Sequence, residues 1–210
     1  MIKRAYLDAA TSTVELLDDP AVAASWNVPS ALREFTVSGL AGHLARQIFQ
    51  VSRVLAQDPP DEQPITLLEH YTGSRWLAAD VDNEVNVRIR RDGEKEAADG
   101  PAALARQART AVDELREALP AQAPGRVVYL PWGPWALSLD DFLITRMLEI
   151  AVHNDDLAVS VGAETPPLPS AVIDPVVALL SRLAVHRHGA TAVLRALSRA
   201  ERAPATIAAI

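Results

Sequence analysis

The sequence predicts an all-α fold: a helical bundle with a small hairpin or irregular crossover and a C-terminal helical extension. Apolar residues recur at helical spacing along most of the 210 residues, whereas alternation with a period of two is nearly absent. Apolar residues make up 49% of the chain and charged residues 22%. No run approaches the roughly 20 unbroken apolar residues that a membrane span requires. These observations favour a water-soluble helical bundle.

The first two helices of this bundle follow from apolar spacing and capping residues. A first helix is expected over residues 3–18, followed by a loop around residues 26–30. A second helix begins near Thr36 or Ser38, because either hydroxyl can accept a hydrogen bond from the free N–H groups of a helix start. Its apolar pattern continues to about Gln57.

The middle of the chain is expected to be helical after a proline-rich loop. Residues 58–64 contain three prolines, which lack an N–H and restrict the preceding residue. This segment is therefore expected to be a loop. The helical pattern resumes at Thr66, passes through Trp76 and Val85, and frays into the charged segment 90–99. A further helix follows.

The next helix and the two segments after it complete the central part of the chain. Gly100 and Pro101 are typical of a helix start, and this helix reaches Leu119. Residues 126–139 contain short β-type runs on either side of a Pro-Trp-Gly-Pro cluster, which predicts a small hairpin or irregular crossover.

The most apolar helix of the chain is expected over residues 142–161, with Asp140 or Asp141 as its cap and Gly162 at its end. It should cross the centre of the bundle. The tail, residues 171–202, contains two more helical stretches separated near His188 and Gly189, with Asp174-Pro175 as a start signal. About 40 residues rarely sustain a core of their own. We therefore expect a bundle over residues 1–165 and an extension over 166–210 that packs on it.

Charge and cysteine content restrict the function. A net charge of −7 without a basic stripe argues against a nucleic-acid partner. The N-terminal residues show no apolar run before a cleavage signal, so a cytoplasmic protein is expected. The chain has no cysteine, so a bound metal must be held by imidazole and carboxylate groups, and any thiol must come from outside.

A polar stripe interrupts the apolar surface of the expected central helix. Its members lie three, four and three residues apart and therefore share one face: Arg146, Glu149, His153 and Asp156. Glu149 and His153 can bind one cation together with His43, which lies on the inward face of the second helix with Leu40, Gln47 and Val51. Three protein ligands leave a fourth position open, as in catalytic zinc sites. The alternative is an ordinary pair of neighbours on a helix beside a hydrogen-bonded core histidine.

Residues 145–158 (TRMLEIAVHNDDLA), followed by Gly162, are similar to the signature of the mycothiol-dependent maleylpyruvate isomerase family within the DinB-like superfamily. Four other segments resemble that family as well: residues 26–30, 36–37, 42–45 and 131–133. The resemblance implies an up-and-down four-helix bundle in which His43, Glu149 and His153 bind one divalent metal, commonly zinc. It also implies mycothiol as co-substrate. The Ala- and Pro-rich composition with only two lysines is typical of the GC-rich genomes of actinobacteria, which make this thiol.

The predicted function is therefore a metal-dependent enzyme that activates a small thiol for transfer to, or isomerisation of, an electrophilic substrate. Asp156 is the predicted further catalytic residue, either as a base or as a group that steadies the metal ligands. The chain has no recognisable sterol-carrier-like second domain, which argues against maleylpyruvate itself as substrate. A metal- or ligand-binding protein without turnover and a metal-dependent hydrolase are the alternatives. A monomer or homodimer without a membrane or nucleic-acid partner is expected.

The remaining polar candidates are interpreted as structural. His70 is expected at the surface or behind the metal ligands, and His186 and His188 near a helix end, where imidazolium suits the helix dipole. Four arginines could hold a substrate carboxylate but are more typical of a solvated face. They are Arg75, Arg88, Arg90 and Arg91.

Overall fold

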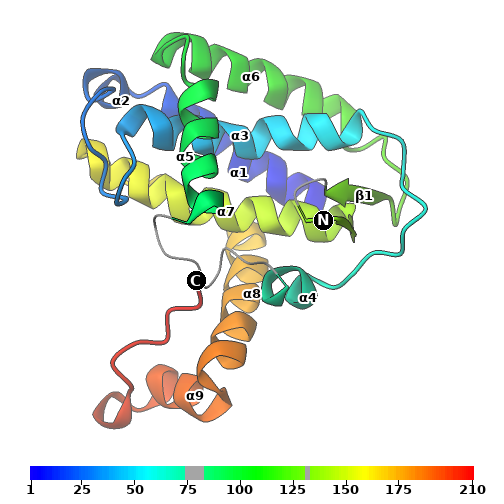
Figure 1. The fold of residues 1–210 in the computed structure, drawn as a ribbon, viewed down its shortest axis with the longest axis vertical. Helices are drawn as coiled ribbons and strands as arrows, with labels where there is room; N and C mark the ends of the chain where they lie inside the picture. Colours follow the sequence, from blue (N-terminus) through cyan, green and yellow to red (C-terminus); the bar gives the residue numbers. More distant parts are fainter. Residues whose placement is uncertain (74–82, 131–132) are drawn as a thin grey trace.

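The computed structural model describes residues 1–73, 83–130 and 133–210. Four long helices form a bundle, with the other elements around it (Figure 1). The bundle helices are α1 (Ile2–Leu17), α3 (Val37–Leu55), α6 (Pro101–Ala118) and α7 (Leu139–Val161). The other elements are α2 (Pro20–Ala24), α4 (Leu67–Thr72), α5 (Glu84–Glu96), β1 (Val127–Leu130), β2 (Trp135–Ser138), α8 (Ser170–His188), α9 (Ala190–Ser198) and the short 3-10 helix η2 (Ala200–Arg202). This confirms the predicted all-α class. None of the helices in the described part of the chain has the length and apolar character needed to cross a membrane.

The direction of the four helices gives the bundle its connectivity. In Figure 1, α1 and α7 run one way and α3 and α6 run the other way. Helices α3 and α6 are consecutive bundle helices along the chain and run parallel. A long connection that contains α4 and α5 therefore joins them. Parallel neighbours cannot be linked by a short loop, which explains why this part of the chain leaves the bundle.

The capping residues settle two of the predicted helix starts. The Thr36 hydroxyl accepts a hydrogen bond from the Gly39 N–H at 3.0 Å, so Thr36 rather than Ser38 caps α3. The expectation that Asp140 or Asp141 caps α7 is wrong, because the Ser138 hydroxyl accepts from the Asp141 N–H. The two aspartates lie in the first turn instead, where their charges suit the helix dipole.

The charged helix α5 corrects another expectation. Residues 90–99 were expected to fray, but α5 continues to Glu96 and crosses α3 with glycine packed on glycine. A methyl group added to Gly42 would lie 2.0 Å from the Gly93 carbonyl oxygen. This backbone contact stabilises a helix whose own side chains bury little. The continuous helix expected from Thr66 is also not formed, because α4 ends at Thr72; Trp76 lies outside the described residues.

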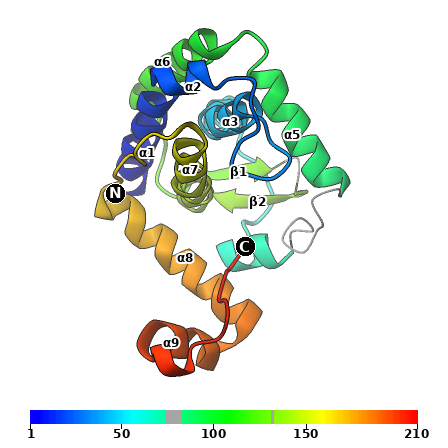
Figure 2. The same cartoon turned by 90° about the vertical axis from the view of Figure 1, so that its left-hand side faces the viewer.

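The C-terminal part of the chain is attached to the bundle through α8. Its buried side chains, among them Val172, Val176 and Leu179, belong to the same hydrophobic core as α1 and α7. Helix α9 packs on α8, and Figure 2 shows both projecting from one side of the bundle. The expectation that Asp174-Pro175 starts this helix is wrong, because α8 begins at Ser170 and Pro175 lies inside it. The division at residue 165 stays a prediction.

Strands β1 and β2 form an antiparallel hairpin, with Val127 opposite Ser138 and Leu130 opposite Trp135. The hairpin, rather than an irregular crossover, therefore connects α6 to α7. It leads directly into α7, because its last residue, Ser138, is the cap of that helix. The hairpin thus sets where the helix that carries the polar stripe begins.

Candidate metal centre

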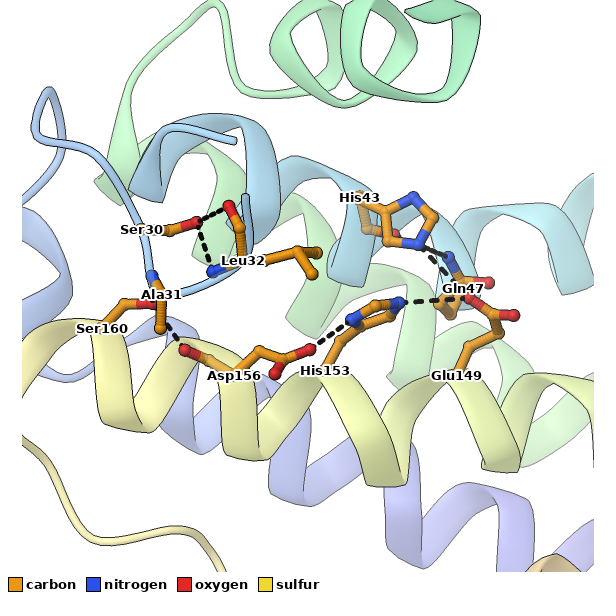
Figure 3. A network of polar contacts seen from close by, with 9 residues as sticks. All are labelled: Ser30, Ala31, Leu32, His43, Gln47, Glu149, His153, Asp156 and Ser160. Carbon is orange, nitrogen blue, oxygen red and sulfur yellow. Dashed lines mark hydrogen bonds and ion pairs between the residues drawn. The ribbon is translucent and has the colours of Figure 1, made fainter. Parts of the chain in front are cut away.

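The three residues predicted as metal ligands lie together between α3 and α7. His43 comes from α3, and Glu149 and His153 come from α7. One ligand atom from each side chain lies within 4.8 Å of the other two, and Figure 3 shows the side chains pointing toward one another. His43 is buried, and the other two are half-buried. The arrangement is one that could hold a metal ion.

Buried polar contacts fix the rotation of α7 about its own axis, and this rotation turns Glu149 and His153 toward α3. Asn154, next to His153, is fully buried and faces α1. Its side-chain oxygen accepts a hydrogen bond from the Thr13 hydroxyl at 3.2 Å, and its nitrogen donates to the Ser12 hydroxyl. Because Asn154 is held on the α1 side, the preceding histidine is turned to the α3 side.

Glu149 lies between the two histidines. Its Oε2 is 3.3 Å from Nε2 of His43 and 3.5 Å from Nε2 of His153. On the other edge of its ring, His153 has Nδ1 2.8 Å from Oδ2 of Asp156. A carboxylate accepts hydrogen bonds, so Nδ1 carries a proton in this contact. When His153 loses its second proton, it therefore presents the lone pair of Nε2 to the cluster.

Burial and charge set the protonation of these groups in opposite directions. Burial lowers the pKa of His43, although hydrogen bonding to Glu149 partly offsets this effect. For His153, burial lowers the pKa, but hydrogen bonds to Asp156 and Glu149 outweigh it and raise the pKa to about 9. Burial also raises the pKa of Glu149, but hydrogen bonds from both histidines dominate and hold it well below its usual range. Near neutral pH, the cluster therefore holds a neutral His43, a protonated His153 and a Glu149 carboxylate.

The donor set fits a divalent cation. When His153 gives up its proton, two imidazole nitrogens and one carboxylate oxygen face one another with no proton between them, and a cation relieves the repulsion among these acceptors. Two histidines and one carboxylate are a known catalytic zinc set that leaves one position for another ligand. Asp156 holds the far nitrogen of His153, as residues behind metal ligands commonly do. Its role as a catalytic base stays a prediction.

A buried polar network lies directly behind the cluster. Gln47, one turn after His43, donates from Nε2 to the His43 carbonyl oxygen at 2.7 Å. Arg146, one turn before Glu149, donates from Nη1 to the side-chain oxygens of Gln47 and Gln50. The sequence placed Gln47 on the inward face and Arg146 on the polar stripe, but it gave no sign that they pair.

The loop before α3 borders the cluster on the side of Asp156. The Ala31 N–H donates to the Ser160 hydroxyl at 2.8 Å, which ties this loop to α7 one turn beyond Asp156 (Figure 3). From the same loop, the ring of Phe35 lies 6.0 Å from that of His43. Ala31 and Phe35, which lie between the two resembling segments 26–30 and 36–37, thus border the site.

His70 is closer to the chemistry than the sequence indicated. Its side chain is only 4% exposed, and its Nδ1 accepts a hydrogen bond from the Trp135 indole N–H at 2.8 Å. Burial, aided by the Arg146 charge and opposed by that of Glu149, lowers the pKa of His70 to about 4. The surface position considered for His70 is therefore wrong, and a place behind the metal ligands agrees with its burial. The signal that sequence reasoning missed is Trp135, which contacts His70 from β2.

The other predicted residues lie away from the cluster. Arg88 and Arg91 are exposed on α5, as expected of a solvated face, and Arg90 is half-buried; Arg75 lies outside the described residues. On α8, His186 is exposed, and Nε2 of His188 lies 2.8 Å from the Ala208 carbonyl oxygen. Neither histidine belongs to the metal cluster.

Comparison with known proteins identifies the family. The family described as "Mycothiol maleylpyruvate isomerase N-terminal domain" matches residues 6–158, which include all three residues of the cluster and Asp156. No curated protein and no solved structure matches the chain. Because the match covers more than half of the sequence, the chain belongs to the mycothiol maleylpyruvate isomerase N-terminal domain family.

Proposed function

We propose that this protein is a divalent-metal-dependent enzyme that activates a low-molecular-weight thiol, mycothiol, for transfer to or isomerisation of a small electrophilic substrate. The observation that carries the proposal is the convergence of His43, Glu149 and His153 within 4.8 Å. Membership of a family named for a mycothiol-dependent reaction supports the thiol. The absence of cysteine means that the thiol must be a separate molecule.

Each residue of the site has a distinct part in this proposal. His43, Glu149 and His153 hold the cation, for which we propose zinc. A divalent cation bound there lowers the pKa of a thiol at the fourth position, as it does for water. Glu149 supplies the single negative charge among the three ligands, so the site keeps positive charge for an anionic thiolate. Asp156 orients His153 by accepting a hydrogen bond from its Nδ1–H group. We place the reaction in the cytoplasm, where small thiols are kept reduced.

Metal content is the first test. The purified protein should contain about one divalent metal ion per chain, measured by elemental analysis. The His43→Ala and His153→Ala variants should lose it, whereas His186→Ala, at an exposed site on α8, should retain it. Unchanged metal content in both ligand variants, or no zinc uptake by the wild-type chain, would contradict the proposal.

Dependence on an added thiol is the second test. Electrophiles should be screened with mycothiol, with other thiols and with no thiol, and turnover should require the thiol. Equal rates without a thiol would indicate a metal-dependent hydrolase instead. Stoichiometric metal and tight thiol binding without turnover of any electrophile would indicate a binding protein.

A further inference from the structure

The Gln47 side chain is held in one orientation by two partners. Arg146 Nη1 donates to its Oε1, and its own Nε2 donates to the His43 carbonyl oxygen at 2.7 Å. A guanidinium group has no acceptor and a carbonyl oxygen has no donor, so each partner independently requires the same placement of the amide oxygen and nitrogen. The amide nitrogen therefore faces His43.

The second N–H of this amide group faces the metal cluster. Apart from the His43 carbonyl, Gln47 Nε2 has a contact with His43 Nε2, 3.4 Å away and at the long end for a hydrogen bond (Figure 3). Without a cation, this ring nitrogen donates to the Glu149 carboxylate, and in an occupied site its lone pair would bind the cation. In both cases the second N–H of Gln47 lacks an acceptor among the described residues, although the side chain is only 1% exposed. A buried donor without a partner is unfavourable, so the occupied site needs a new acceptor here.

Arg146 adds positive charge at the same place. It is only 8% exposed and has no ion-pair partner within 4.0 Å among the residues that the structure describes. It contacts the uncharged side chains of Gln47, Gln50, Thr145 and Phe142. The guanidinium already helps to keep Glu149 ionised. Because its hydrogen-bond partners are uncharged, it also attracts a further anion nearby, and in a poorly solvated site this attraction is stronger than in water.

We propose that Gln47, oriented by Arg146, is a ligand-binding residue that donates a hydrogen bond to an anion at the open position of the metal centre. It thereby makes the centre prefer anionic ligands, including a thiolate, over neutral ones. The inference rests on the metal site of the proposed function and adds to it a residue that determines ligand class.

The test uses two small ligands on the full-length protein loaded with Co²⁺, whose visible spectrum reports ligand binding. Azide is the anionic probe and can accept a hydrogen bond from Gln47. Imidazole is the neutral probe, because its metal-bound nitrogen has no lone pair left to accept one. Gln47→Met keeps the length of the side chain but removes the donor. It should weaken azide binding by about tenfold or more, the usual effect of losing one hydrogen bond to a charged group, and leave imidazole affinity unchanged.

Two further variants keep the test decisive. Gln50→Met is the matched control, because Gln50 also accepts from Arg146 at 2.6 Å and lies on the same helix; it should leave the ratio of azide to imidazole affinity unchanged. Gln47→Glu keeps the shape and the bond to Arg146, and should weaken azide binding further while Co²⁺ binding is retained. If Gln47→Met fails to fold, this variant decides.

The outcomes separate this inference from the proposed function. Failure of the wild-type chain to bind Co²⁺ would overturn both. Normal Co²⁺ binding with unchanged azide affinity in the Gln47 variants would overturn the role of Gln47 alone. Equal weakening of azide and imidazole would also overturn it, because the defect would then be a general disturbance of the site.

Discussion

Asp156 and His153 are joined by a 2.8 Å contact between Oδ2 and Nδ1, and this contact decides which nitrogen of His153 faces Glu149. The Asp156 carboxylate has two effects on the His153 ring. It fixes the ring orientation and makes Nε2 a better electron-pair donor.

Asp156→Asn should weaken metal binding by about 10–100-fold, because residues that orient a metal-bound histidine commonly have effects of this size. The measurement is competition with a chelator of known affinity. Asp155→Asn is the control, since Asp155 is the neighbouring residue on α7 but is exposed and bonded to Thr165. Equal loss in both variants would contradict a specific role for Asp156.

Metal binding should displace a proton from His153. The pKa of His153 is raised to about 9 in the metal-free protein, so the ring is protonated near neutral pH and must lose that proton to bind a cation. Apparent metal affinity should therefore rise about tenfold per pH unit up to roughly pH 9 and then level off. Calorimetric titration of the metal in buffers of different ionisation enthalpy measures the proton count. A count near zero at pH 7.5 would be inconsistent with this protonation.

His70 should make the protein sensitive to acid. Its pKa is about 4 when folded and 6.5 when unfolded, so the unfolded chain binds more protons between these values. The stabilisation is thus present above pH 6.5 and decreases as pH falls toward 4, by a total of about 3 kcal/mol. Denaturant unfolding at several pH values measures this loss. His70→Gln should reduce the slope in this window, and the exposed-site variant His186→Gln should keep it; the reverse result would reject the assignment.

The helix crossing of α3 and α5 should not tolerate a side chain. Gly42→Ala would bring the new methyl group to 2.0 Å from the Gly93 carbonyl oxygen and should cost about 1–3 kcal/mol in the free energy of unfolding. Metal affinity should fall as well, because Gly93 also borders His43. Ser52→Ala on the same helix is the control and should change stability by less than about 0.5 kcal/mol. Unchanged stability of Gly42→Ala would show that the helices can separate freely.

The features predicted well from the sequence were those with a local signal. Glu149 and His153 are one helical turn apart, and their segment resembles a family signature, so their place on one face required no knowledge of the rest of the chain. The apolar periodicity likewise located α1, α3, α6 and α7 to within a few residues.

The features that were missed depend on contacts between distant segments. Arg146 and Gln47 are 99 residues apart, and no spacing rule links them. His70 is buried by Trp135, 65 residues away. The charge of residues 90–99 suggested that this segment would fray. That prediction failed because the stabilising contact is between two glycines, which carry no hydropathy signal. Isolated glycines within helical patterns were the available hint, since they often mark close packing.

The distance along the chain between the proposed metal ligands also sets an order of events during synthesis. His43 is translated 106 residues before Glu149. At about 5–20 residues per second, this interval lasts roughly 5–20 seconds. During that time the first ligand belongs to a helix that has neither of its two coordinating neighbours. Capture of the proposed cation by all three side chains can therefore only follow the synthesis of residues 149–153, and a chain interrupted before residue 149 would lack two of the three proposed ligands.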